Sequence, residues 1–221
     1  MKKEWSEEEL KEVASQLGNP DGSAGVKTGE RMYHSNANMI SFGINSLDIK
    51  SGDIVLEIGP GNGGHVSSIA NIAGAVQYHG VDISETMVQE ANKLNEELVT
   101  AGQVSFTLSD GNILEFGDDT FDKIFTVNTV YFWKNPSAFA SEIYRVLKPG
   151  GVFSLVFSDK SFMQQLPFTR FGFQLYDRPL AEQLLSEANF SILKTIEELE
   201  MTKSNLGEDV ERPVIAVVAK K

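Results

Sequence analysis

The stretch "VLEIGPGNGGH", residues 55–65, joins a short apolar run to four glycines within six positions. The glycines are Gly59, Gly61, Gly63 and Gly64, and an acid, Glu57, stands two residues before the first of them. Glycine lets a backbone turn sharply and approach a ligand closely. Because ligands of open parallel sheets bind beyond the carboxyl ends of the strands, the stretch predicts a strand followed by a ligand-binding loop.

Outward from this loop, apolar strand-like runs alternate with segments of helical periodicity. Strands are expected at residues 52–58, 76–83, 104–110, 121–128 and 152–158, and helices at 64–73, 84–102 and 136–151. The alternation predicts an α/β fold with a mostly parallel sheet covered on both faces. A further helix (179–189), a strand (191–201), a polar loop and a last strand (213–220) predict a hairpin that closes the sheet edge.

The two ends of the chain differ from this alternating centre. Residues 1–50 predict a charged helix (6–17), a loop "GNPDGSAGVKTGE" and a second helix at about 31–47, which together would form an N-terminal helical cap. Residues 51–221 would form the main domain. Within it, the aromatic-rich residues 159–177 show no clear period and are expected to form a lid insertion.

Composition narrows the class of protein. Acids outnumber bases by 31 to 19, giving a net charge of −12, which disfavours a nucleic-acid partner because phosphates are neutralised by Lys and Arg. No cysteine is present, which removes disulfides and thiolate sites. Three isolated histidines predict no metal site. No apolar run is long enough to span a bilayer, and a cytoplasmic location is the default expectation. The oligomeric state stays open, a homodimer included.

The glycine loop fits more than one cofactor. The spacing Gly59-x-Gly61-x-x-Gly64 matches the dinucleotide pattern, which presents an anionic pyrophosphate to the loop. Glu57 would repel that pyrophosphate, and a buried carboxylate is costly unless a cation satisfies it. The ammonium group of S-adenosylmethionine (SAM) supplies such a cation. Glu57 therefore favours SAM over NAD, with a structural ion pair to a local Lys or Arg as the alternative.

Polar residues also follow the next two strands. Asp82 ends the second strand about 23 residues after Gly59, the usual place for an acid that binds ribose hydroxyls. Ile83 and Met87 could flank an adenine or pack in the core. Residues 110–113, Asp-Gly-Asn-Ile, offer acceptors and donors to an adenine edge, although the same residues suit an ordinary Asp-Gly turn.

Five motifs resemble those of the class I SAM-dependent methyltransferases, in the small-molecule branch that includes ubiquinone and menaquinone C-methyltransferases. They are "VLEIGPGNGGH", "GVDIS", "SDGNILEF", "FDKIFTVNTVYFW" and "EIYRVLKPGG", in the family's order across nearly half the chain. The resemblance implies a Rossmann-like sheet of seven strands, mostly parallel, with helices on both faces and an antiparallel last strand. It also implies SAM as the cofactor, S-adenosylhomocysteine as its product and methyl transfer as the activity.

The resemblance further implies roles for individual residues. Glu57 and the loop backbone at Gly59 and Gly61 would hold the methionine part, Asp82 the ribose hydroxyls, and Ile83 the adenine face. Asn62 and Met87 are further candidate cofactor-binding residues. Asp110, Gly111, Asn112 and Ile113 would face the adenine edge, and Asn128 would lie beside the methionine part through its backbone carbonyl. Residues 128–131, Asn-Thr-Val-Tyr, lack the two prolines of adenine and glutamine N-methyltransferases, which argues against DNA and amide acceptors.

The acceptor and any general base are less constrained by the sequence. His34 and Tyr131 are the candidate catalytic residues, whereas His65, at a positive helix terminus, is expected to be neutral. Aromatic residues at 131–133 and in the lid indicate a flat or apolar small-molecule acceptor, or simply lid packing. An NAD-linked oxidoreductase and a non-catalytic SAM-binding protein stay open as alternatives.

Overall fold

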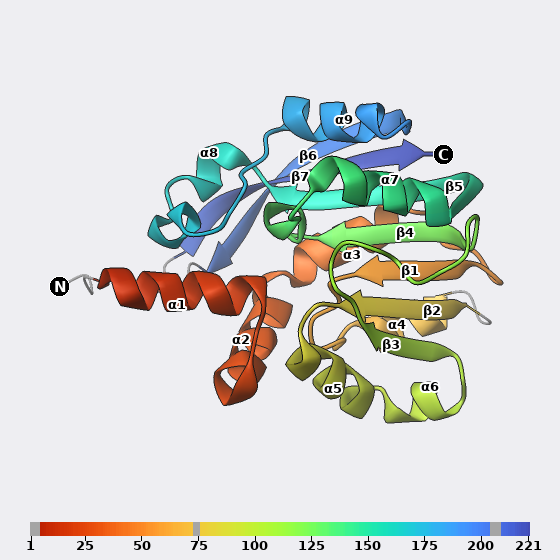
Figure 1. Cartoon of the computed structure of the whole chain (residues 1–221), viewed down its shortest axis with the longest axis horizontal. Coiled ribbons are helices and arrows are strands. Elements are labelled where there is room, and N and C mark those ends of the chain that lie inside the picture. Colours follow the sequence, from red (N-terminus) through yellow and green to blue (C-terminus); the bar gives the residue numbers. More distant parts are fainter. Residues whose placement is uncertain (1–4, 73–75, 204–208) are drawn as a thin grey trace.

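The computed structural model describes residues 5–72, 76–203 and 209–221, which form one seven-stranded mixed sheet (Figure 1). The strand order is β3-β2-β1-β4-β5-β7-β6. β7 pairs antiparallel with both β5 and β6, and the other neighbouring strands are parallel, so the expected α/β sheet with an antiparallel last strand is confirmed. The strands are β1 (Ile54–Ile58), β2 (Gln77–Asp82), β3 (Val104–Leu108), β4 (Phe121–Val127), β5 (Leu147–Ser158), β6 (Ser191–Lys203) and β7 (Asp209–Lys220).

Helices cover both faces of the sheet (Figure 1). On one face, α7 (Pro136–Val146) and α9 (Arg178–Glu187) pack with β4, β5 and β7 around a large apolar core. On the other, α3 (Ala37–Ser46), α4 (Val66–Ile72) and α5 (Glu85–Leu94) bury a second core. The remaining helical elements are α1 (Glu7–Gly18), α2 (Gly22–Ser35), α6 (Glu96–Thr100), α8 (Lys160–Met163), η1 (Val130–Phe132) and η2 (Pro167–Arg170). No helix of the described residues is long and apolar enough to cross a membrane.

The N-terminal region differs from the sequence expectation. Residues 22–30, expected to be part of a loop, belong to α2, and the helix expected at 31–47 is divided at Asn36 into the end of α2 and the whole of α3. Tertiary packing explains the helical glycines. A Cβ on Gly25 would lie 2.7 Å from the carbonyl carbon of Pro20, and one on Gly29 would lie 2.6 Å from the sulfur of Met87. The missing side chains therefore let α2 pack closely against α5 and the loop before α2.

The helix expected at 84–102 is also divided, at Asn95. This residue leaves the helical conformation (φ −115°, ψ 25°) between α5 and α6. Its side-chain amide donates to the carbonyl oxygens of Gly63 at 3.0 Å and Ala91 at 2.9 Å. The break thus ties the end of α5 to the glycine loop, a contact between distant segments that helical periodicity does not encode.

Smaller differences lie at element ends. The residues expected to form a lid insertion without a clear period contain α8 and η2, and both hairpin strands extend further than expected, β6 to Lys203 and β7 from Asp209. The centre of the expected polar loop, 204–208, lies outside the described residues, as does Ala73, the expected end of the helix at 64–73.

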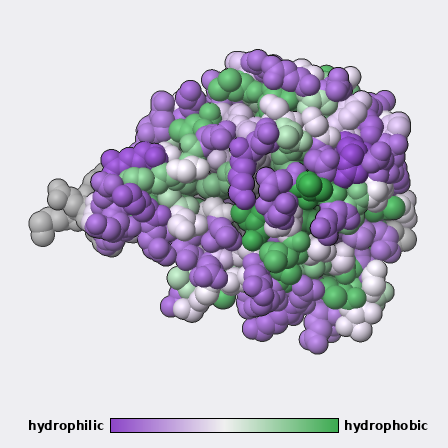
Figure 2. Space-filling model, in the orientation of Figure 1, coloured by the Kyte–Doolittle hydropathy of each residue, from purple (hydrophilic) through white to green (hydrophobic). Residues whose placement is uncertain are grey.

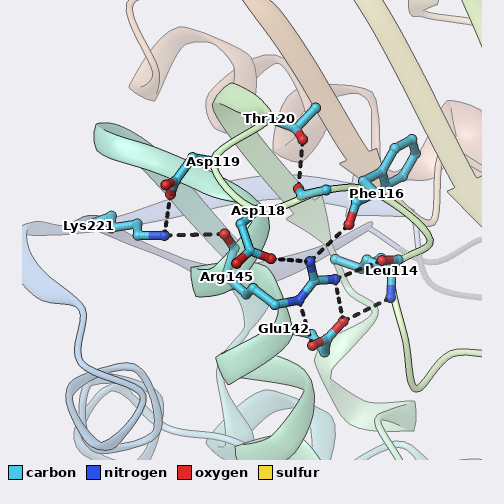
Figure 3. A network of polar contacts seen from close by, with 9 residues as sticks. Leu114, Phe116, Asp118, Asp119, Thr120, Glu142, Arg145 and Lys221 are labelled. Atoms are coloured by element: carbon cyan, nitrogen blue, oxygen red, sulfur yellow. Dashed lines mark hydrogen bonds and ion pairs between the residues drawn. The ribbon is translucent and has the colours of Figure 1, made fainter.

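A polar network fixes the chain between β3 and β4 (Figure 3). Arg145 of α7 donates to the carbonyl oxygens of Leu114 and Phe116, both at 2.9 Å. The same guanidinium pairs with Glu142 and Asp118, each at 2.8 Å. One arginine therefore holds the segment that begins at the carboxyl end of β3.

Candidate cofactor-binding site

The glycine loop follows β1 and takes a conformation that requires glycine. Gly59, Gly61 and Gly63 have φ values of 75°, 58° and 65°, in the left-handed region. A Cβ on Gly59 would lie 2.4 Å from the side chain of Thr129, whereas one on Gly61 would meet nothing within 4 Å. The loop is thus packed tightly against the residues after β4 at Gly59 and is open at Gly61, where a ligand can approach the backbone.

Glu57 lies buried at the end of β1, with an exposed fraction of 1%. Its Oε2 accepts hydrogen bonds from the Tyr78 hydroxyl at 2.6 Å and from His65 Nε2 at 2.7 Å. No described residue donates to its other oxygen, Oε1, and neither Lys nor Arg contacts the carboxylate. The structural ion pair with Lys or Arg is therefore absent from the described residues, and the Oε1 atom of the carboxylate is left for a ligand.

The contacts of His65 favour its charged form more than the sequence suggests, and its expected neutral state stays a prediction. Burial disfavours the imidazolium, but the charge of Glu57 and its hydrogen bond outweigh burial and raise the pKa of His65. Its other nitrogen, Nδ1, is buried and has no hydrogen-bond partner among the residues that the structure describes. The ring stacks on Tyr33 of α2, with centroids 6.5 Å apart. The carboxylate of Glu57, in direct contact with His65, therefore opposes the effect of the positive helix terminus on the pKa of His65.

Asp82 lies at the end of β2, next to β1 in the sheet. Its two oxygens accept from the backbone N–H groups of Gly61 at 3.1 Å and Ser84 at 2.9 Å. Burial raises the pKa of Asp82 to about 6, against the opposing effect of these two N–H groups. Asp82 therefore fixes the glycine loop through the Gly61 N–H, and its role in binding ribose hydroxyls stays a prediction.

The segment after β3 forms a tight polar turn with exposed apolar side chains beside it. Asp110 Oδ1 accepts from the backbone N–H groups of Asn112 at 2.7 Å and Ile113 at 3.0 Å, and these bonds lower the pKa of Asp110. Ile83 and Ile113 are 41% and 59% exposed, and a Cβ on Gly111 would lie 3.1 Å from Ile83. Figure 2 shows apolar surface interrupting the hydrophilic surface over this part of the sheet. The Asp-Gly turn expected as the alternative at residues 110–113 is therefore present, and it lies next to an apolar surface suited to a flat ring.

Asn128 follows β4 and has a left-handed conformation, with φ of 59°. Its side-chain amide donates to Asn36 Oδ1 at 3.3 Å, and its Oδ1 accepts from the Tyr131 hydroxyl at 3.2 Å. The Tyr131 hydroxyl also accepts from the Ser158 N–H at 2.7 Å and donates to the Ser158 carbonyl at 3.0 Å. Because Tyr131 is only 2% exposed and burial raises its pKa, this geometry favours a structural role, and its catalytic role stays a prediction.

Three other expected site residues occupy different surroundings. Met87 is fully buried beneath Gly29 of α2, which favours the core-packing alternative to an adenine contact. Asn62 is 8% exposed, and its Oδ1 accepts from the Gly64 N–H at 3.2 Å. His34 is exposed near the end of α2, and its ring centroid lies 5.1 Å from that of Tyr33. The cofactor and catalytic roles of these residues stay predictions.

The lid aromatics pack mainly against each other and α1. Phe173 contacts Phe132 and Phe168, with centroids 4.6 Å and 5.8 Å apart. Phe168 shares a buried cluster with Leu10 and Ala14 of α1. These contacts correspond to the packing alternative for the aromatic residues and hold α1 against the lid segment.

Sequence reasoning missed two partners of Glu57. His65 stands eight residues further along the chain, just beyond the glycine turn, and its capacity to become a cation was the available signal. Tyr78 gave no such signal, because its contact depends on the register in which Val55 of β1 pairs with Tyr78 of β2. That register places its hydroxyl diagonally across from Glu57.

Residues 56–155 match the family model described as "Methyltransferase domain". These 100 of the 221 residues are therefore similar to that family, and the sheet order is shared with a solved SAM-dependent methyltransferase.

Among curated relatives, the chain is 33% identical over 128 residues to a sterol 24-C-methyltransferase of Eremothecium gossypii, a match covering 58% of this chain and 34% of that protein. The chain thus spans about a third of that relative's length. A SAM-dependent methyltransferase of Aquifex aeolicus shares the fold with a TM-score of 0.67 and 20% identity over 95% of this chain and 97% of that one. A geranyl diphosphate C-methyltransferase of Streptomyces coelicolor shares it with a TM-score of 0.69 and 15% identity, covering 93% and 87%.

Proposed function

We propose that the protein transfers the methyl group of SAM to a small-molecule acceptor. The observation that carries the proposal is the buried Glu57 carboxylate, whose Oε1 has no donor among the described residues, beside a glycine loop that is open at Gly61. A buried anion with a free oxygen requires a cation or a strong donor. The ammonium group of SAM meets that requirement, and a dinucleotide pyrophosphate does not.

The remaining site residues would each take one part of the cofactor. Glu57 and the backbone at Gly59 and Gly61 would hold the methionine part, with Asn62 shaping the loop and Asn128 beside it. Asp82 would accept from the ribose hydroxyls. Ile83 would pack on adenine, whose edge would face residues 110–113. The exposure of Ile83 and Ile113 supports the adenine assignment, since both offer apolar surface beside a polar turn.

Bound SAM supplies an activated methyl group on a sulfonium. The work left to this chain is to position the two reactants and exclude water. The helices α1, α2 and α3 form the proposed cap, and α2 already lies over the glycine loop, where Tyr33 is 3.2 Å from the Cβ position of Gly64. If the acceptor loses a proton, His34 is the exposed candidate base.

Two observations support a proposal for the class of acceptor. The curated relative and the structural neighbour named above act, by their names, on a sterol and on geranyl diphosphate, which are small molecules with large apolar parts. Aromatic side chains also line the segments after β4 and β5, although many of them pack against α1. We therefore propose an acceptor with a flat or apolar body.

Calorimetric titration with SAM and with NAD tests the cofactor assignment. SAM binding without NAD binding is expected, and the reverse would refute the proposal. Glu57→Ala should weaken SAM binding markedly, with Asp53→Ala, at an exposed turn before β1, as the control.

Turnover of methyl-labelled SAM against sterols, prenyl diphosphates, quinones, phenols and amines then tests the activity. Binding without turnover on any acceptor class would favour a non-catalytic SAM-binding protein.

A further inference from the structure

In the free protein, Glu57 already has an internal partner, His65, that becomes a cation when it is protonated. His65 Nε2 lies 2.7 Å from Glu57 Oε2, and both side chains are buried, with exposed fractions of 8% and 2%. The groups facing this pair are Tyr78 from β2, whose hydroxyl donates to Glu57, and Tyr33 from α2, whose ring stacks on His65. Asp82, at the end of β2, adds a further negative charge nearby.

The surroundings of His65 stabilise its protonated form only in part. An imidazolium has two N–H donors, and only Nε2 has an acceptor here, because Nδ1 is buried without a partner. An imidazolium at His65 would therefore depend almost entirely on Glu57. Anything that neutralises Glu57 removes the reason for His65 to stay protonated in a buried position.

We propose that His65 is a positioning residue for the cofactor, whose imidazolium serves as a stand-in cation for Glu57 and releases its proton to solvent when the ammonium group of SAM binds that carboxylate. This inference rests on the proposed role of Glu57. Beside Glu57 the exchange is one for one: the ammonium group of the ligand arrives, and one proton leaves His65 for solvent. The neutral ring then keeps its Nε2–H bond to Glu57 and orients the carboxylate.

The coupling gives binding a defined pH dependence. Below the pKa of His65 in the free protein, each unit of falling pH should weaken binding up to tenfold, because the proton must be displaced. The test uses S-adenosylhomocysteine, which carries the same amino group and does not turn over. Its amino group stays protonated below about pH 7.5, since α-amino groups titrate near 7.7–8.0. Affinity is measured by calorimetry between about pH 5.5 and 7.5.

Three variants separate His65 from its neighbours. His65→Gln keeps a donor for Glu57 but cannot titrate. The affinity of this variant should therefore change less with pH than that of the wild type, by up to a factor of ten for each pH unit. Asp82 titrates in the same range and contributes equally to both profiles, so the difference between them is diagnostic. Tyr78→Phe should change affinity and keep the slope. His79→Gln, on β2 with its ring bonded to Ser105, is the control that should keep the wild-type slope.

Two direct readouts complete the test. Calorimetry in buffers of different ionisation enthalpy should show more protons released by the wild type than by His65→Gln. Histidine NMR titration should show the pKa of His65 falling when S-adenosylhomocysteine binds. Binding with equal proton release in both proteins, or an unchanged His65 titration, would overturn the proposal and leave the cofactor assignment standing. No binding at any pH would overturn both.

Discussion

Arg145 holds the segment between β3 and β4, and its removal should destabilise the fold measurably. Its guanidinium makes five hydrogen bonds: two to the carbonyls of Leu114 and Phe116, and three to Glu142 and Asp118. Well-formed bonds from a charged donor contribute about 1.5–3 kcal/mol each. Ion pairs that reach solvent contribute about 0–1 kcal/mol.

The side chain of Arg145 is 32% exposed, so solvent reduces these contributions. Arg145→Ala should therefore lower the free energy of unfolding by about 3 kcal/mol, mostly through the two carbonyls that lose their donor. For a domain of this size, such a loss corresponds to a fall in Tm of roughly 6–12 °C. Arg145→Lys should recover only a small part, because an ammonium cannot reproduce the planar fork.

Urea denaturation measures the effect, and Arg178→Ala is the matched control. Arg178 pairs with Glu182 and Glu197 on the surface, and its side chain is 51% exposed. Its removal should cost less than about 1 kcal/mol. If the two alanine variants are equally stable, the network in Figure 3 does not hold the segment as argued.

Three further predictions concern the site. Because the pKa of Asp82 is raised to about 6, its contribution to stability is full below about pH 4 and is lost as pH rises through 6. Denaturation across this range should therefore show the wild type losing up to roughly 3 kcal/mol relative to Asp82→Asn, and parallel profiles would contradict the raised pKa. Gly59→Ala should destabilise by about 3 kcal/mol or more, because its Cβ meets Thr129, whereas Gly102→Ala, also at positive φ but in open space, should cost about 1 kcal/mol in the same assay. Tyr131→Phe should lower stability by about 1–2 kcal/mol and leave kcat within a few-fold, and a far larger loss of kcat on a responsive acceptor would restore its catalytic role.

Sequence patterns identified most of the fold because its signals are local. The hydrophobic period and the positions of proline and glycine predict the strands and the glycine loop. The acids at the strand ends predict the site, because these strands are neighbours in the sheet. The failures share one cause, which is packing between distant segments. The glycines at 25 and 29 read as a loop in the sequence, yet they allow a helix to pack closely on α5. The break at Asn95 reflects its bonds to the glycine loop.

The same cause limits the prediction of the site. Glu57 was expected to have either a ligand or a basic residue as its partner, and the structure gives it a histidine and a tyrosine instead. Tyr131 offered a hydroxyl next to the expected pocket, but its bonds to Ser158 become visible only once β4 and β5 are paired. To predict a role that depends on where a side chain points, one must know how the strands pair, and the residue order alone does not give that register.

The position of β7 has a consequence for how the chain reaches this structure. Of the seven strands, β7 is made last, yet it lies inside the sheet between β5 and β6. During synthesis β5 has an open side and β6 has no partner until β7 leaves the ribosome, so the hydrophobic faces beneath α9 stay incompletely covered. We therefore expect the half of the sheet from β5 onward to assemble only after translation of that strand, as a single late step.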